Sequence, residues 1–371
     1  MAAPQHSISR HLIPPWRVTR LALVLGLMAA LLALAPAAQA DPAHHERTAY
    51  QQTNLVSDVP GLATLTDPNL VNAWGLSAGP ATPIWVADNG TDKSTLYNGA
   101  VNGSPPAIVP LVVNVAGAPT GTVFNGGTGF NVSAGGVTTP ARFIFDTESG
   151  TLLGWAGPLD GTAQVTATVP GAIYKGLAIA TNDKGTFLYA ANFHDSRIDV
   201  FDSTFTLTHL SGDFRDRFLP RGFAPFNVQE LGGKLYVSYA KQDAERSDEV
   251  AGRGLGFVDV FDTKGHLLRR LISRGRLNAP WGLVIAPEGF GQFSGDLLVG
   301  NFGDGRINAY DRHGHFRGSL RDENGQPIVI DGLWALRFGN GVAGSPTTLL
   351  FSAGIDDEAH GLFGSIEAVE E

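Results

Sequence analysis

Acidic and amide side chains recur at one position of a repeated pattern in this sequence, directly after a short apolar run. In chain order, that position holds Asp88, Asp146, Asn192, Ala240, Asn301 and Gly354. Further candidate ligands follow closely, namely Asp92, His194, Asp195, Asp304, Asp356 and Asp357. Carboxylate and amide oxygens are the ligands that calcium and other hard divalent cations prefer. If the fold brings these positions together, the pattern predicts an oxygen-rich ring that binds such a cation.

A second interpretation of the same residues needs no ligand. Asp and Asn are frequent in turns, because their side chains accept hydrogen bonds from nearby backbone N–H groups and because both residues tolerate left-handed conformations. The sequence leaves open whether the ring binds a cation or holds turns.

Three shorter motifs are weaker candidates for chemistry. Residues 75–79 match the hydrolase pattern G-x-S-x-G, but that pattern works only where a strand turns sharply into a helix, and here Pro80 follows. The glycine-rich residues 252–256 precede a strand rather than the helix that a dinucleotide site requires. His313 and His315 fall in a predicted turn without a third nearby ligand. No catalytic residue follows from these motifs.

The element that positions the candidate residues is a repeat. An inner apolar phrase recurs six times, with anchor residues Trp74, Phe130, Lys175, Phe226, Trp281 and Trp334, which are 56, 45, 51, 55 and 53 residues apart. Each phrase is followed by a second apolar run, then a third strand such as 197–202 and a fourth such as 266–271. Four short strands in each of six repeats predict an all-β, six-bladed β-propeller.

The two ends of the chain are predicted to meet in the last blade. The sixth repeat is one strand short, whereas the strand-like residues 53–57 precede the first repeat without a blade of their own. We expect these residues to complete the last blade, which would close the ring and remove an exposed sheet edge. The strand ends that carry the polar ring would then surround one opening of the central channel.

Lys175 breaks the pattern of anchors. The other five anchors are aromatic, so a cation is expected near the axis in the third blade. A buried lysine needs a partner or a functional reason. It either binds a ligand, or its stem packs like an apolar residue while its head reaches channel water or a neighbouring Asp. The predicted ligand-binding residues are Lys175, Asp88, Asn192, His194, Asp195, Asn301, Asp304 and Asp356.

The first 40 residues have the pattern of a secretory signal peptide. Arg10, Arg17 and Arg20 precede an apolar run over residues 21–34, and the triplet Ala38-Gln39-Ala40 follows. A run of 14 residues is shorter than the roughly 20 that a membrane span requires. We expect cleavage after Ala40, export to the periplasm or the extracellular space, and one propeller domain over residues 41–371 without a membrane span.

Composition limits the partners. Because residues 1–40 contain three Arg and no acidic residue, their removal lowers the formal net charge from −9 to −12. Such an acidic chain is not expected to bind nucleic acid, which is recognised largely through Lys and Arg. The absence of Cys excludes thiol nucleophiles and disulfides. A small molecule, a glycan or a protein remain possible partners, and we expect a monomer.

Two segments resemble a known repeat family. Residues 188–202 and 297–311 resemble the NHL repeat, and the chain from Asn54 to Glu367 resembles an uncharacterised family of exported bacterial β-propellers, some of which carry a PEP-CTERM tail. This resemblance implies a six-bladed fold and no established activity.

Two functions are compatible with this fold. The first is a binding or interaction module with an unknown ligand. The alternative is a metal-dependent hydrolase that resembles gluconolactonase, with a cation in the central channel. The gluconolactonase pattern needs a Glu early in the first blade, and no Glu lies between Glu46 and Glu148. Asn192, Asn301 and Asp356 match its channel ligands only in part, so binding is the favoured interpretation.

Overall fold

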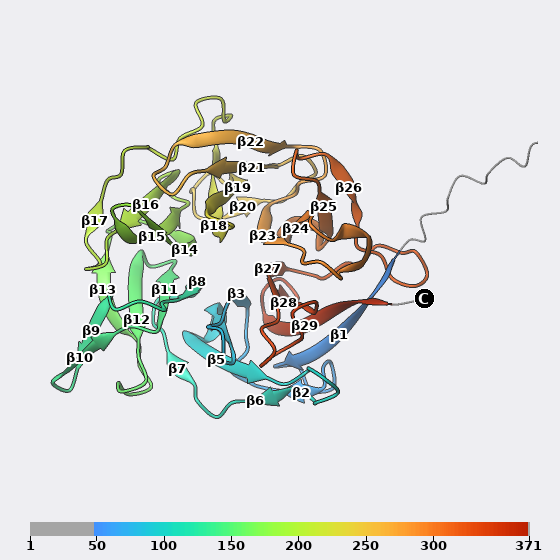
Figure 1. The fold of residues 1–371 in the computed structure, drawn as a ribbon, viewed down its shortest axis with the longest axis horizontal. Coiled ribbons are helices and arrows are strands. Elements are labelled where there is room, and N and C mark those ends of the chain that lie inside the picture. The colour runs from blue at the N-terminus through green and yellow to red at the C-terminus, as the bar shows by residue number, and fades with distance from the viewer. Residues whose placement is uncertain (1–47, 370–371) are drawn as a thin grey trace, which may run out of the picture. The chain divides into compact units, whose positions relative to one another are not determined.

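The structure, a computed structural model, describes residues 48–369 and places them in one compact unit that consists almost entirely of β-strands. Six small antiparallel sheets, which we call blades 1–6, form a ring (Figure 1). The innermost strands of the six blades are β3 (Ala73–Ser77), β8 (Pro119–Phe124), β14 (Tyr174–Asn182), β18 (Phe223–Leu231), β23 (Pro280–Ile285) and β27 (Leu333–Phe338). Each contacts the next around the axis, and β27 contacts β3. The predicted six-bladed β-propeller is confirmed.

The remaining strands follow outward in the predicted order. The second strands are β4 (Ile84–Asp88), β11 (Phe143–Thr147), β15 (Gly185–Asn192), β19 (Lys234–Gln242), β24 (Leu297–Asn301) and β28 (Leu349–Ile355). The third strands are β5 (Lys93–Asn98), β12 (Thr151–Trp155), β16 (Arg197–Phe201), β21 (Gly256–Phe261), β25 (Ile307–Tyr310) and β29 (His360–Val369). The outermost strands of blades 1–5 are β6 (Ala107–Ile108), β13 (Gln164–Thr168), β17 (Leu207–Thr208), β22 (Leu267–Ser273) and β26 (Phe316–Ser319).

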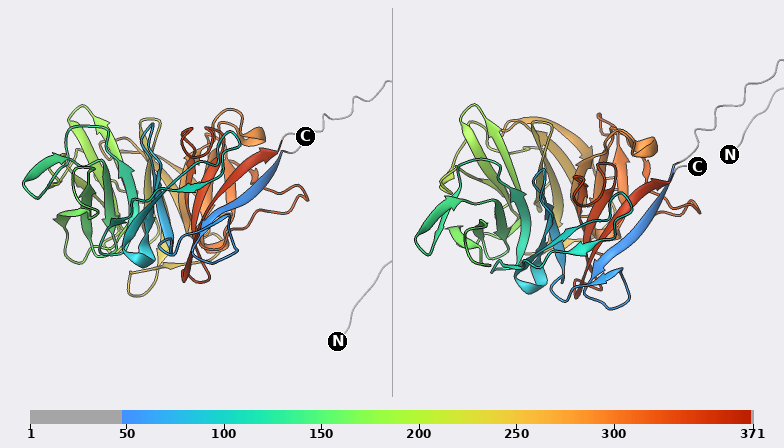
Figure 2. Two further views of the ribbon diagram at one scale, coloured as in Figure 1. Left: turned by 90° about the horizontal axis from the view of Figure 1, so that it is seen from below. Right: turned by 60° about the horizontal axis from the view of Figure 1, so that its bottom comes forward.

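Blade 6 is completed by the N-terminal part of the described chain. Strand β1 (Ala49–Ser57) pairs antiparallel with β29, from Ala49 opposite Val369 to Ser57 opposite Leu362. Both views in Figure 2 show these two strands side by side. The short β2 (Leu65–Thr66) adds to the outer edge of β1. The predicted ring closure is therefore confirmed, and the two ends of the propeller are hydrogen-bonded to each other.

Short elements decorate the ring. They are β7 (Val113–Asn114), the hairpin β9 (Asn131–Ala134) and β10 (Val137–Pro140), β20 (Glu249–Val250), and the 3-10 turns η1 (Asn89–Thr91), η2 (Gly291–Phe293) and η3 (Phe302–Asp304). No helix among the described residues is long and apolar enough to cross a membrane.

The anchor predicted for blade 2 is wrong. Phe130 lies just before the hairpin β9–β10 and packs its ring against Phe205 at a centroid distance of 5.2 Å, away from the axis. The innermost strand is β8, and its anchor is Thr120. The hairpin is an insertion whose apolar phrase resembles an inner strand, and this resemblance caused the error. Only four of the six anchors are therefore aromatic.

Every blade has a β-bulge at its anchor. In blade 1, for example, Ala73 pairs with Asp88 but Leu76 pairs with Val86, so two residues on β3 face one on β4. The same shift occurs at Thr120, Lys175, Phe226, Trp281 and Trp334. A bulge bends its strand and redirects a side chain. In each blade, the bulge lies at the anchor, which is the residue that the inner strand places near the axis.

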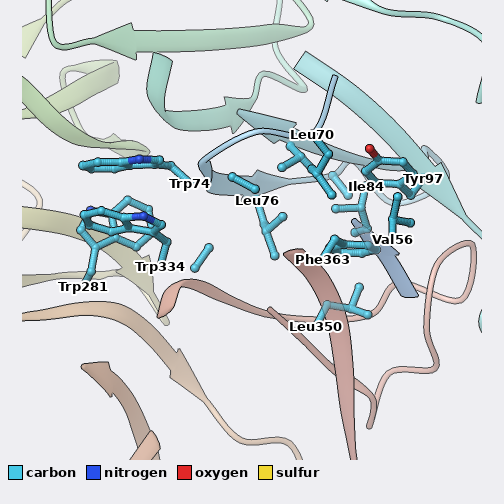
Figure 3. Packing of buried hydrophobic residues seen from close by; sticks show 14 of the residues in the cluster. Val56, Leu70, Trp74, Leu76, Ile84, Tyr97, Trp281, Trp334, Leu350 and Phe363 are labelled. Carbon is cyan, nitrogen blue, oxygen red and sulfur yellow. The ribbon is translucent and has the colours of Figure 1, made fainter. Parts of the chain in front are cut away.

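Aromatic side chains fill the middle of the ring (Figure 3). The rings of Trp74 and Trp334 stack with centroids 3.4 Å apart, and Trp281 meets both edge-on at 6.2 and 5.9 Å. Phe302 and Phe226 pack against Trp334. We call these five residues the aromatic layer. It divides the axis of the propeller into two ends.

Candidate functional site

One end of the axis carries a cluster of charged side chains around Lys175. The inner strands begin and the second strands end at this side, so the loops that follow the second strands surround it. The ammonium group of Lys175 lies 2.5 Å from Glu148 Oε1 and 3.0 Å from Asp248 Oδ1. Glu249 and Glu358 lie close enough to affect the ionisation of one another and of the lysine. We call these five residues the mouth cluster.

Four different blades supply the mouth cluster. Lys175 is on β14, and Glu148 is in the turn that follows β11. Asp248 and Glu249 come from the long connection between β19 and β21, which contains β20. Glu358 is in the turn between β28 and β29 and has a left-handed backbone with φ 65°. Three consecutive blades bring Lys175 together with Glu148, Asp248 and Glu249, and closure of the ring adds Glu358 from the sixth blade.

A chain of hydrogen bonds connects the mouth cluster to the aromatic layer. Trp334 Nε1 donates to Asn72 Oδ1 at 3.3 Å. Asn72 Nδ2 donates to Asn89 Oδ1 at 3.2 Å and to Glu358 Oε2 at 3.3 Å. Asn89 Nδ2 donates to Glu148 Oε2 at 3.0 Å. Two carboxylates of the cluster are thus held in position by amide side chains.

Lys175 is charged although its side chain is only 1% exposed. Burial by itself would lower its pKa, but the carboxylates of Glu148, Asp248 and Glu249 outweigh burial and hold the pKa above its usual value. The ammonium group also lies 5.2 Å from the centroid of Trp74, where the face of the indole attracts a cation. The lysine is a permanent positive charge at the centre of the cluster.

The carboxyl groups outnumber that charge. Burial raises the pKa of Glu249 to about 7, against the opposing effect of Lys175. Burial, together with repulsion from Glu249, raises the pKa of Glu358 to about 7. The cluster therefore carries three net negative charges when all four carboxyls are ionised, and one when Glu249 and Glu358 are protonated.

The predicted ring residues of the first two blades lie inside their sheets. Asp88 is completely buried, and burial raises its pKa well above its usual range. Asp146 is also buried, and its Oδ1 accepts hydrogen bonds from the Thr120 hydroxyl at 2.9 Å and the Gly121 N–H at 2.6 Å. Asp146 thereby holds the bulge of its own blade.

The predicted ring residues of the third blade bond to one another. Asn192 Nδ2 donates to Asp199 at 2.8 Å and to Asp195 at 3.2 Å. His194 Nδ1 lies 3.1 Å from Asp195 Oδ1. These contacts hold the turn between β15 and β16.

The fifth and sixth blades repeat this behaviour. Asn301 Nδ2 donates to Asp304 Oδ1 at 3.0 Å and to the Arg276 carbonyl at 2.8 Å. Asp356 is exposed in a turn, where its N–H donates to Asp331. Of the eight predicted ligand-binding residues, the structure places only Lys175 at the centre of the mouth cluster. Whether the others bind a ligand stays a prediction.

The arrangement of possible metal-ligating side chains was compared with what a metal site requires. Among residues 48–369, no group of three or more His, Cys, Asp or Glu side chains is arranged to hold one. Glu148 and Asp248, the central oxygen donors, are already paired with an ammonium group. Asn192, Asn301 and Asp356, the partial match to gluconolactonase, have the separate local contacts described above.

Sequence reasoning missed Glu148, Asp248, Glu249, Glu358 and Asn72. All except Asn72 follow a second strand, which is where the ring was expected, but at different distances from the strand end. The one available signal was the length of the fourth blade's connection between β19 and β21, which is longer than the corresponding turns.

The comparisons with known proteins identify relatives but no activity. No protein-family model matches the chain. Uncharacterized protein R648 of Acanthamoeba polyphaga mimivirus is 34% identical over 333 residues, which cover 86% of this chain and 80% of that protein. Uncharacterized protein L690 of the same virus is 34% identical over 328 residues, covering 84% of each chain.

A solved structure supports the fold alone. A Bacteroides thetaiotaomicron protein of unknown function aligns with a TM-score of 0.52 at 10% identity, covering 86% of this chain and 77% of that one. Because the relatives found by sequence are viral, the resemblance to exported bacterial propellers remains a prediction. The chain belongs to the same protein family as the uncharacterized proteins R648 and L690 of this mimivirus.

Proposed function

We propose that the protein is a binding module that takes up a cationic group, an ammonium or a guanidinium, at the mouth cluster. The observation that carries this proposal is the imbalance of charge, because four carboxyl groups converge on one lysine. Glu148 and Asp248 share the single charge of Lys175, and among residues 48–369 Glu249 and Glu358 form no ion pair with a cation. A ligand cation would complete the charge balance.

The raised pKa values of Glu249 and Glu358 indicate that nearby positive charge does not offset their burial and the repulsion between the carboxyls. A carboxyl that is both desolvated and surrounded by like charges is held partly protonated near neutral pH. A bound cation would favour the ionised form of both groups and would be attracted in return. Perturbed carboxyls that meet at the end of a channel are typical of functional sites.

The cluster is accessible from solvent. The side chain of Asp248 is 68% exposed and that of Glu148 is 29% exposed, while Lys175 lies beneath them. Asp356 and Asp357 are exposed on the turn that carries Glu358. An approaching cation therefore meets carboxylates first, and the field of several like charges steers it inward.

Calorimetric titration with agmatine and spermidine tests the proposal, with glycerol as an uncharged probe. We expect saturable binding of the cations that is at least fivefold tighter at pH 8 than at pH 6. Glu249 and Glu358 are mostly ionised at pH 8 and mostly protonated at pH 6, so fewer negative charges attract the ligand at the lower pH. Glu358→Gln should weaken binding by a similar factor. The matched control Glu323→Gln removes one exposed carboxylate from a distant turn and should leave binding unchanged. Absence of saturable binding at pH 8, or equal binding by Glu358→Gln, would contradict the proposal.

The earlier prediction of a calcium ring is tested separately. A thermal melt with calcium and with chelator reports any ion that binds only the native state. A rise with calcium that Asn301→Ala or Asp356→Ala removes would support a metal site at those residues. An unchanged midpoint would leave them as turn residues.

Export is part of the proposal, since it rests on the apolar run at residues 21–34 and the small residues before Asp41. These residues lie outside the described part of the chain. N-terminal sequencing of protein from the periplasmic and extracellular fractions of a Gram-negative host should find Asp41 as the first residue. An intact N-terminus in the cytosolic fraction would contradict export.

A further inference from the structure

A second hollow lies at the other end of the axis, beyond the aromatic layer. This cavity of about 250 Å³ is lined by residues from all six innermost strands, and Trp281 is among them. An adjoining cavity of about 200 Å³ shares Leu76, Thr122, Gln229, Glu230 and Arg337 with it. The two cavities therefore form one polar-edged hollow, which we call the axial cavity, and it shares no residue with the mouth cluster.

Arg337 is the cation of the axial cavity. It lies near the end of β27, and its Nη2 donates to the Ala78 carbonyl oxygen at 3.0 Å. Its Nε is buried without a hydrogen-bond partner. Burial lowers the pKa of Arg337, and no acidic group contributes an opposing effect. Within residues 48–369, Arg337 makes no ion pair with a carboxylate.

A half-buried guanidinium without a counter-charge is unusual because desolvation of a charge is costly unless an opposite charge compensates it. Arg270 on β22 is also half-buried, and its charge is compensated by an ion pair with Asp216. Glu230 also lines the axial cavity and its Oε1 accepts a hydrogen bond from the Gly233 N–H at 2.6 Å, but it makes no ion pair with Arg337. The charge of Arg337 is left for another partner.

Thr122 provides a second, independent observation. Its residue is only 6% exposed, it lines both parts of the axial cavity, and its hydroxyl has no hydrogen-bond partner. Buried polar groups are nearly always satisfied by protein, water or ligand. Two polar side chains with unused hydrogen-bonding capacity line one hollow, whose surface is mostly polar with smaller apolar contributions from Leu76, Leu177 and Leu336. This lining matches a small ligand with a charged head and a short apolar body.

We infer that the axial cavity binds a small organic carboxylate, whose carboxylate group pairs with Arg337 and accepts a hydrogen bond from Thr122. Arginine is suited to this role because its planar N–H groups match a carboxylate in two places. The apolar body of the ligand lies against the leucines and the indole of Trp281. This site is independent of the proposed cation site, since its ligand has the opposite charge and enters from the opposite end.

Fluorescence titration of the whole protein tests the inference, because Trp281 lines the cavity and reports its occupancy. The probes are hexanoate and benzoate, and the uncharged matches are hexanamide and benzamide. We expect a carboxylate to change the fluorescence saturably and to raise the melting midpoint, and the amides to bind at least tenfold more weakly. Amides that bind as well as carboxylates, or no saturable change with any probe, would overturn the inference.

Two variants locate the site. Arg337→Met keeps the length of the side chain but removes its charge, and Thr122→Val keeps the volume but removes the hydroxyl. We expect Arg337→Met to bind carboxylates at least tenfold more weakly and Thr122→Val several-fold more weakly. The control Arg312→Met removes an exposed arginine from the turn after β25 and should bind like the unmodified protein. If Arg337→Met does not fold, Thr122→Val and Arg337→Lys decide, and unchanged carboxylate binding in both contradicts the assignment.

Discussion

The indole Nε1 of Trp281 donates a hydrogen bond to the backbone carbonyl oxygen of Lys175 at a distance of 2.7 Å. This bond joins blade 5 to blade 3 across the axis, so the aromatic layer supports the backbone of the buried lysine. Trp281 also lines the axial cavity. One residue therefore contacts both ends of the axis and separates the two candidate binding sites.

Trp281→Phe should show how much the hydrogen bond from Trp281 to the Lys175 carbonyl contributes to the free energy of unfolding. The substitution keeps an aromatic ring but leaves the buried carbonyl oxygen of Lys175 without its donor, which costs about 1–3 kcal/mol. Trp74→Phe is the matched control, because Trp74 is equally buried but its Nε1 has no hydrogen-bond partner. Urea denaturation should show a larger loss of unfolding free energy for Trp281→Phe. Equal losses would mean that only the ring volume matters.

Lys175→Met should destabilise the fold more at high pH than at low pH. Without the ammonium group, Glu148 and Asp248 lose their counter-charge, and repulsion within the mouth cluster is unopposed. Because Asp248 is largely exposed, we expect a loss of about 1–3 kcal/mol at pH 8 rather than the larger cost of a fully buried pair. At pH 5, protonation of Glu249 and Glu358 relieves part of the repulsion.

The control for this substitution is Lys93→Met. Lys93 is half-buried, and its Nζ donates to Asn69 Oδ1 and not to a carboxylate. Its loss of stability should vary little with pH, because Lys93 makes only the smallest of the contributions to the pKa of one carboxyl, Asp88. If the effect of Lys175→Met were equally flat between pH 5 and pH 8, the charge imbalance of the mouth cluster would be wrong.

The unmodified protein should lose stability as the pH rises from about 4.5 to 7. Glu249 and Glu358 have folded-state pKa values of about 7 against an ordinary value of 4.5. The native state therefore binds more protons than the unfolded state in this window, so the free energy of unfolding falls with rising pH and levels off above 7. Asp146 and Asp259, whose pKa values are raised by burial to about 7, act in the same direction.

Urea denaturation at pH 5, 6, 7 and 8 measures this slope. Glu358→Gln should make the slope less steep, because the amide does not titrate, while Glu249, Asp146 and Asp259 still contribute. Glu323→Gln should leave it unchanged. A stability that rises across the window would show that the carboxyls of the mouth cluster are ionised more easily in the folded state than in the unfolded one.

The fold could be predicted because its repeat is local. Each inner strand has an anchor at a bulge and, in blades 1, 2, 3 and 5, a glycine next to it. A Cβ at Gly75 would lie 2.5 Å from the Thr120 carbonyl oxygen, and one at Gly121 would lie 2.3 Å from the Leu177 nitrogen. Crowding at the axis thus imposes a sequence pattern. The residues around Phe130 have the same apolar pattern but belong to an inserted hairpin. A short apolar segment does not show from sequence alone whether it lies near the axis.

The candidate site could be predicted only at its centre. Lys175 could be identified because it is a charged residue at a position of the repeat where most blades have an aromatic residue. Glu148, Asp248 and Glu358 lie in turns of unequal length, so aligning the strands does not align them. Their meeting depends on the path of each turn and on closure of the ring, which are long-range properties. Some of the regular Asp and Asn positions make local hydrogen bonds within strands and turns, as at Asp146 and Asn192, and whether they also bind a ligand stays a prediction.

Ring closure itself can be tested with a disulfide, since the chain contains no Cys that would compete. Thr53 on β1 lies directly opposite Ser365 on β29. Oxidation of the double variant Thr53→Cys and Ser365→Cys should link the two ends of the propeller and raise the free energy of unfolding by about 2–4 kcal/mol, because almost the whole ring becomes one closed loop in the unfolded state. Reduction should remove the gain, and each single variant should unfold like the unmodified protein. If oxidation yields no intramolecular link, β1 is not paired with β29 in this register, and the closure of blade 6 is wrong.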